Sequence, residues 1–175
     1  MKVKIGKYPK HRFYHNWFKA LGGKWEERVS VRIDPWDTWS MDSTLSHIVV
    51  PMLEQLRETT HGAPHIDDAD RPPQFLGTVV DRNSGDVDEF HFDAWDWILG
   101  EMLFAHKSKN EEWYAKFCSG AHDITWVESE ISDYSVMTKG PNDTFKIDME
   151  GRDAYQARIT NGFRLFGKYY ENLWD

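Results

Sequence analysis

The chain has 175 residues, of which 40% are hydrophobic and 15% aromatic, a composition that fits a folded domain and excludes a disordered chain. Its formal net charge of −8 argues against non-specific binding to nucleic acid. Cys118 is the single cysteine, which excludes an internal disulfide and a cysteine-rich zinc site. No stretch reaches the roughly 20 apolar residues that cross a bilayer, and no apolar signal segment follows Met1, so we expect a cytoplasmic protein without a membrane partner.

Charge and aromatic residues are distributed unevenly. Residues 1–32 hold nine Lys/Arg against two acidic residues, whereas residues 67–101 hold ten Asp/Glu against two Arg. The sequence therefore predicts a basic face and an acidic face on one protein. Nine tryptophans are more than packing usually needs, and we expect some to face a ligand or partner. The alternative is that they fill a core poor in aliphatic residues.

The N-terminal third predicts two strands and one helix. Apolar and polar residues alternate at 3–5 and 29–33, the period of a half-buried strand, and residues 1–27 form a basic, aromatic region around a short helix or loop at 8–21. Apolar residues at helical spacing between Leu45 and Leu56 predict a helix that begins near Asp42 or Ser43 and ends near Thr60. Pro51 lies inside it, so we expect a kink around residues 47–51.

The rest of the chain predicts two more helices and a hairpin. Residues 61–92 contain three prolines and a turn-rich run, typical of a long, acidic, irregular connection. Asp93 is expected to cap a helix that reaches Leu103, with a further helical piece at 111–117. The β-like residues 124–138, a turn at 140–143 and residues 145–147 predict a hairpin.

The last helix is expected over about residues 153–173. Its apolar arc is predicted to face the core and contains Tyr155, Ile159, Phe163, Phe166, Tyr170 and Leu173. Its other arc, predicted to be solvated or to bind an anion, contains Arg158, Asn161, Leu165 and Lys168. Together the elements predict one α+β domain over residues 1–175, with a small antiparallel or mixed sheet packed with about three main helices.

Two imidazoles and two carboxylates lie close together in the connection and suit a metal ion such as zinc, manganese or iron: His61, His65, Asp67 and Asp68. Gly62 and Pro64 make a helical zinc motif improbable, and the alternative is a solvated loop whose histidines form local hydrogen bonds. We expect no cofactor, with this metal site as the open exception. The sequence contains no Gly-rich phosphate loop and no nucleophile elbow, which favours a protein that is not an enzyme.

Stacking and anion-binding side chains gather at two other places. Trp36 and Trp39 bracket a helix start, where free N–H groups and the helix dipole attract negative charge. The last helix adds guanidinium, ammonium and phenol groups, which can hold a base and its phosphates without chemistry. The predicted ligand-binding residues are Trp36, Asp37, Thr38, Trp39, Ser40, Asp42, Arg158, Asn161, Arg164, Lys168 and Tyr169. The alternative is that the tryptophans hold the helix to the sheet and the basic residues pair with acids.

Four segments resemble a family of uncharacterised proteins encoded by tailed bacteriophages: 36–45, 61–68, 140–148 and 158–175. The likeness runs through most of the chain from about residue 28, and the N-terminal region is short by comparison. The resemblance implies a phage gene product that acts in the cytoplasm of an infected bacterium. It implies no catalytic residue, because no activity is established for the family.

Three functions follow as hypotheses. The leading one is a non-enzymatic phage protein that binds a nucleotide-like small molecule and sequesters a host defence signal. The second is an acidic interaction module that inhibits a basic host protein through residues 67–101. The third is a metal-dependent phosphoester hydrolase built on His61, His65, Asp67 and Asp68. A homo-oligomer is compatible with each of them.

Overall fold

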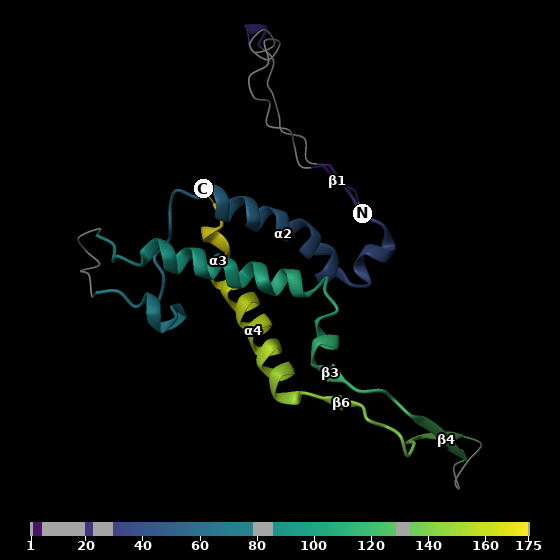
Figure 1. The fold of residues 1–175 in the computed structure, drawn as a ribbon. Helices are drawn as coiled ribbons and strands as arrows, with labels where there is room; N and C mark the ends of the chain where they lie inside the picture. Colours follow the sequence, from purple (N-terminus) through teal and green to yellow (C-terminus); the bar gives the residue numbers. More distant parts are fainter. Residues whose placement is uncertain (1, 5–19, 23–29, 79–85, 129–133, 175) are drawn as a thin grey trace. The chain divides into compact units, whose positions relative to one another are not determined.

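The computed structural model describes residues 2–4, 20–22, 30–78, 86–128 and 134–174 (Figure 1). The chain divides into two units, residues 1–45 and residues 46–175, here named the N-terminal and C-terminal units. The described residues form long α-helices and small antiparallel two-stranded sheets, which confirms the predicted α+β class. The predicted single domain stays a prediction, and residues 5–19 and 23–29 of the basic N-terminal region lie outside the described residues.

The N-terminal unit contains the first two predicted strands, which pair with each other. β1 (Lys2–Lys4) runs antiparallel to β2 (Ser30–Arg32), and Val3 is paired with Val31. A 3₁₀ turn, η1 (Pro35–Thr38), follows β2. Asp34 caps this turn: its carboxylate accepts a hydrogen bond from the Trp36 amide, while the Asp37 carboxylate accepts one from the Asp34 amide. This reciprocal cap satisfies amides that would otherwise lack partners at the turn's start.

α2 (Met41–Thr59) confirms the predicted helix to within one or two residues, with Pro51 inside it. The predicted kink at Pro51 stays a prediction. Only Ser46 and Leu53 are fully buried among its residues. The predicted irregular connection follows, and its described part contains two short 3₁₀ turns, η2 (Asp68–Asp70) and η3 (Pro73–Phe75).

α3 (His91–Ser108) and α4 (Met149–Lys168) pack against each other and contain most of the core. Gly162 permits their close approach, since a Cβ built there would lie 2.4 Å from the Glu101 carbonyl oxygen and 2.6 Å from the Ala105 Cβ. The fully buried large side chains are Trp95, Ile66, Ile98, Leu99, Met102 and Leu165. One tryptophan therefore lies at the centre of the core, as the core-filling alternative requires.

The start of α3 corrects one prediction. Asp93 lies in the first turn of the helix, and the N-cap position is held by Phe90, which forms no side-chain cap. The helix begins earlier because the Asp88 carboxylate accepts the Phe90 amide, and because His91 is buried with Nε2 3.1 Å from the Ala63 carbonyl oxygen. The predicted helical piece after α3 is present as a 3₁₀ turn, η4 (Trp113–Phe117).

The predicted hairpin between residues 124–138 and residues 145–147 has the wrong pairing, although both segments contain strands. β4 (Ile124–Glu128) pairs with β5 (Ser135–Lys139), whereas β6 (Lys146–Ile147) pairs with β3 (Cys118–Ser119), a strand that the sequence did not predict. The turn at 140–143 therefore connects two short ladders. Between them, the Gly140 amide donates to the Asp123 carbonyl at 2.7 Å and the Thr144 amide to the Ala121 carbonyl at 3.1 Å.

The two predicted arcs of the last helix are wrong at particular residues. Leu165, assigned to the polar arc, is fully buried, whereas Tyr170, assigned to the core, is exposed. α4 also ends at Lys168, and Tyr170 belongs to a separate 3₁₀ turn, η5 (Tyr170–Asn172). The spacing identified an amphipathic helix, but α3 crosses it at Gly162, so the buried stripe is centred on that crossing. None of the described helices has the length and apolar character needed to cross a membrane.

Candidate functional site

The predicted ligand-binding residues fall into both units. Residues 36–42 belong to the N-terminal unit, and residues 158–169 belong to the C-terminal unit. Each group forms a local arrangement of its own, described in turn below.

Trp36 and Trp39 form an exposed aromatic pair. Their ring centroids are 6.3 Å apart and their planes are tilted by 44°. The two residues are 77% and 84% exposed, so neither indole fills a core. The polar neighbours serve the turn itself, since Asp37 completes the cap and the Thr38 hydroxyl donates to the Pro35 carbonyl at 2.9 Å.

The two remaining predicted residues of this group lie at the start of α2. The Ser40 carbonyl accepts the Thr44 amide at 3.0 Å, and Asp42 lies in the first turn of the helix, where a carboxylate favours the helix dipole. Both are exposed. The residues around the two indoles therefore have structural roles that need no ligand.

Arg158 pairs with a buried carboxylate. Its guanidinium donates to both oxygens of Glu101, with the closest contact at 2.6 Å from Nη2 to Oε1. Its Cζ lies 3.8 Å from the centroid of the Phe104 ring, a cation–π contact. The hydrogen bond to Glu101 raises the pKa of Arg158. This cation is therefore held between a carboxylate and an aromatic face.

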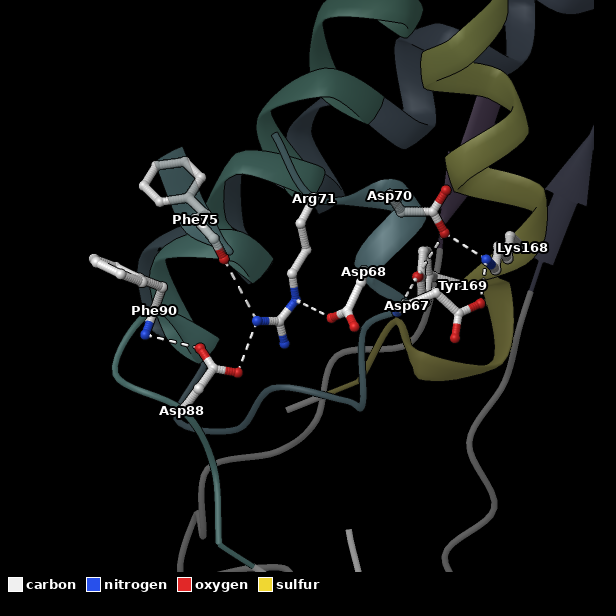
Figure 2. A network of polar contacts seen from close by, with 9 residues as sticks. All are labelled: Asp67, Asp68, Asp70, Arg71, Phe75, Asp88, Phe90, Lys168 and Tyr169. Atoms are coloured by element: carbon white, nitrogen blue, oxygen red, sulfur yellow. Dashed lines mark hydrogen bonds and ion pairs between the residues drawn. The ribbon is translucent and has the colours of Figure 1, made fainter. Parts of the chain in front are cut away.

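Asp70 is the centre of a second polar cluster, which we call the Asp70 cluster (Figure 2). Its side chain is 2% exposed and accepts hydrogen bonds from Arg164 Nη2 at 2.6 Å and from the Tyr169 hydroxyl at 2.8 Å. Lys168 donates to Asp70 and, at 2.5 Å, to Asp67. Burial alone would raise the pKa of Asp70, but the hydrogen bonds from Lys168, Arg164 and Tyr169 outweigh it and lower the pKa.

The remaining two predicted residues, Asn161 and Tyr169, also form hydrogen bonds within the chain. Asn161 Oδ1 accepts from Arg164 Nε at 2.9 Å, and Tyr169 is buried with its hydroxyl accepting the Asp67 amide at 3.2 Å. The cations that the sequence assigned to an anion site thus pair with internal carboxylates. An anionic ligand would have to compete with those carboxylates, and ligand binding by these residues stays a prediction.

A third polar group, centred on Arg71, lies within the connection between α2 and α3 (Figure 2). Arg71, whose side chain is 4% exposed, donates to the Asp88 carboxylate at 2.7 Å, and Asp68 Oδ1 lies 3.9 Å from its Nε. Burial would raise the pKa of Asp88, but the hydrogen bonds from Arg71 and the Phe90 amide lower it. Arg71 therefore links the middle of the connection to Asp88 near the start of α3, on the other side of residues 79–85, which lie outside the described part.

The predicted metal ligands do not gather into a metal-binding group. Within the described part of the chain, no three His, Cys, Asp or Glu side chains lie close enough together to hold a metal ion. His61 and His65 are exposed, Asp67 accepts from Lys168, and Asp68 lies beside Arg71. The metal site and the hydrolase hypothesis stay predictions, which elemental analysis of the purified protein would test.

An apolar groove in the C-terminal unit was not predicted. It has a volume of about 900 Å³ and lies between α2 and the chain that follows the end of α4. Its lining residues are mostly apolar: Val49, Pro51, Met52, Leu53, Gln55, Leu56, Thr59, Phe166, Tyr170, Leu173 and Trp174. Met52, Tyr170 and Trp174 are large, exposed side chains within it.

The apolar residues that line the groove could be recognised in the sequence, but they were not predicted to form a groove. The apolar arc of the last helix was predicted to face the core, and the apolar residues at helical spacing in α2 were used only to predict a helix. Together these two sets supply most of the lining. Periodicity shows that residues share a face, but it does not show whether another element covers that face. Two apolar stripes that leave a shared gap produce a groove.

Comparison of the chain with protein-family models, with curated proteins and with solved structures gives no match in any of the three.

Proposed function

We propose that this protein acts by binding a partner protein, and that the apolar groove holds a helical segment of that partner. The groove itself is the observation that carries the proposal, because it brings Met52, Tyr170 and Trp174 together in one exposed concave surface. Exposed apolar surface of this kind is typical of interaction sites. Tyrosine, tryptophan and methionine are also the residue types enriched at protein interfaces.

The shape of the groove favours a helix as the occupant. One wall is the apolar side of α2, which presents Val49, Met52 and Leu56 at helical spacing, and the other is formed by Phe166 and the residues after α4. A partner helix places apolar side chains at i, i+3, i+4 and i+7 along one face, which suits a groove between two such walls. Met52 is unbranched and polarisable, and it can adapt to different side chains.

The charges beside the groove favour a basic partner. Glu58 follows the lining residue Gln55 by about one helical turn, and Glu171 adjoins the lining residue Tyr170. Both carboxylates are exposed and have no ion pair among the described residues. The net charge of −8 adds to the attraction for a positively charged segment. Since the sequence resembles uncharacterised phage proteins, we expect the partner to be a protein of the infected bacterium.

A model peptide tests the groove directly. We expect an amphipathic Leu/Lys helix of about 18 residues, or five turns, to bind in a titration followed by NMR chemical shifts, and a Leu/Glu peptide of the same pattern to bind at least tenfold more weakly. Met52→Asp should abolish binding, whereas Leu76→Asp, at an exposed residue after η3 and outside the groove, should leave it unchanged. Equal binding by both variants, or shifts that map away from the groove, would overturn the proposal.

The exposed indoles favour a second candidate, the binding of a nucleotide-like molecule. Trp36 and Trp39 are the most exposed tryptophans of the described chain, and base–indole stacking contributes about 1–3 kcal/mol per base. Calorimetry against cyclic nucleotides and ADP-ribose derivatives tests this candidate. We expect binding that is lost in the Trp36→Ala/Trp39→Ala variant, and an absence of heat with every compound would remove the idea.

A further inference from the structure

The β4–β5 ribbon has one face on which large apolar side chains are exposed. The antiparallel register pairs Ile124 with Lys139, Trp126 with Met137, and Glu128 with Ser135, and alternation along each strand places these six residues on the same face. Trp126 and Met137, at its centre, are 68% and 60% exposed. No other described strand pairs with β4 or β5.

The opposite face of the ribbon is different in character. It contains two cross-strand pairs of β-branched residues, Thr125 with Thr138 and Val127 with Val136. The two threonine hydroxyls are 3.0 Å apart and hydrogen-bonded to each other, so their polar groups are satisfied within the ribbon. Val127 and Val136 are 52% and 50% exposed, so neither face of the ribbon is covered, but the Trp126 face has the larger apolar side chains. A two-stranded ribbon alone is marginally stable in water, and a second layer on this face would stabilise it.

The Trp126 face also has opposite charges at its two ends. Lys139 lies at one end and Glu128 at the other, separated by four residues along each strand, or about 13 Å. Neither side chain has an ion pair among the described residues. The apolar centre with one positive and one negative end makes the face complementary to itself when it is turned by 180°.

We infer that the Trp126 face binds the same face of a second copy of this chain about a two-fold axis. The axis passes near the Trp126–Met137 pair, so that these residues of the two copies pack together. Lys139 of each copy then lies opposite Glu128 of the other, and the contact is formed twice. Such an isologous interface is the commonest arrangement of soluble homodimers.

Other occupants fit the ribbon less well. A two-stranded ribbon can enter the major groove of DNA, but that mode requires several cations for phosphate contacts. This face has one cation and one carboxylate, so its charge does not suit a nucleic acid. An unrelated protein partner is compatible with the apolar centre. A second copy also matches the two ends, because its Lys139 and Glu128 can pair with the Glu128 and Lys139 of the first copy.

Charge-swap variants test the inference by sedimentation velocity over a concentration series. The unmodified protein should form dimers, and Glu128→Lys or Lys139→Glu should each weaken the dimer at least tenfold, because each places like charges together. The double variant E128K/K139E should restore the affinity to within about threefold of the original. An equimolar mixture of the two single variants should also form dimers, since the heterodimer brings opposite charges together at both contacts.

Two controls keep the test decisive. Val127→Thr changes the opposite face and should leave dimerisation unchanged, and circular dichroism of every variant checks that the fold is retained. A monomer at all concentrations up to about 1 mM, a limit that corresponds to about 4 kcal/mol of association free energy, would overturn the inference. So would dimers that are unaffected by the single reversals, or single variants that remain monomeric when mixed.

Discussion

Gly162 of α4 lies directly against the main chain of Glu101 in α3, so that a Cβ at this glycine would come 2.4 Å from the Glu101 carbonyl oxygen. Main chain cannot move aside as the end of a flexible side chain can. The hydrogen atom in place of a side chain therefore sets the distance between α3 and α4, the two helices that hold most of the core. The polar contacts of α4 depend on that distance as well, because Arg158 reaches the Glu101 carboxylate from one turn away.

The first prediction concerns Gly162→Ala. We expect this variant to lose about 1–3 kcal/mol of unfolding free energy in urea denaturation, because the added methyl group forces the helices apart. Gly167→Ala is the matched control in the same helix, since a Cβ there meets nothing within 4 Å. The control should gain up to about 1 kcal/mol from helix propensity. Equal effects of the two substitutions would contradict the assigned role of Gly162.

The second prediction concerns Asp70→Asn. The amide keeps the shape of the side chain but removes the charge that Lys168 and Arg164 share, and places amide hydrogens near two cations. We expect a loss of about 1–3 kcal/mol in urea denaturation, less than for a fully buried pair because both cations are partly hydrated. Asp68→Asn is the control, since that side chain is 75% exposed, and it should change stability by less than about 0.5 kcal/mol.

Acid unfolding gives Asp70 a second readout. Its pKa is lowered in the folded state, so the ion pairs stabilise the protein above the ordinary aspartate pKa of 3.8. That stabilisation is lost as the pH falls through the lower folded-state pKa. Asp70→Asn should therefore flatten the acid limb of a stability profile measured between pH 2 and 5. A profile with the original slope would show that Asp70 does not contribute to it.

The third prediction concerns His106. The residue is 6% exposed, its ring lies edge-on to Phe163 and Phe166, and its Nδ1 is 3.1 Å from the Ser46 hydroxyl. Burial lowers its pKa below the ordinary 6.5, so the unfolded chain takes up a proton before the folded protein does. The contribution of His106 to the free energy of unfolding should be constant above about pH 6.5 and should fall as the pH is lowered towards the folded-state pKa.

A variant isolates this histidine from the others. His106→Phe keeps an aromatic ring between Phe163 and Phe166 and removes Nε2, a buried nitrogen with no hydrogen-bond partner among the described residues. We expect the difference in unfolding free energy between the variant and the original protein to shift in favour of the variant as the pH falls from 7 to 5. A difference that is independent of pH would exclude His106 as the titrating group.

The fourth prediction uses a double-mutant cycle on Arg158 and Glu101. Arg158→Ala should lose about 1–3 kcal/mol, because it leaves the nearly buried Glu101 carboxylate without its cation. Glu101→Ala and the double variant Arg158→Ala/Glu101→Ala close the cycle, and the double variant, which leaves no unpaired charge, should cost less than the sum of the two single substitutions. Urea denaturation of all variants measures the coupling. Additive effects would show that the pair is not energetically coupled.

The sequence by itself determined the local features of this protein. Helical spacing and turn residues predicted α2, α3 and α4 to within about five residues, and alternation predicted β1 and β2. Residues 124–138 were predicted to be β-like, but their division into β4 and β5 was not predicted. These features depend on side chains a few positions apart, which share a face or a turn wherever the chain lies. The number of tryptophans led us to expect that some face a ligand or partner, and Trp36 and Trp39 are exposed, although their ligand stays a prediction.

Only the tertiary structure decided which faces are covered and which charges meet. Lys168 and Asp70 are 98 positions apart, and the charge count that predicted separate basic and acidic faces contains nothing that pairs them. Leu165 was assigned to an arc that is solvated or binds an anion, and Tyr170 to the core, because periodicity orients residues relative to one another but not relative to a neighbouring helix. The crossing at Gly162 buries Leu165, and the gap between α2 and the residues after α4 leaves Tyr170 exposed in a groove.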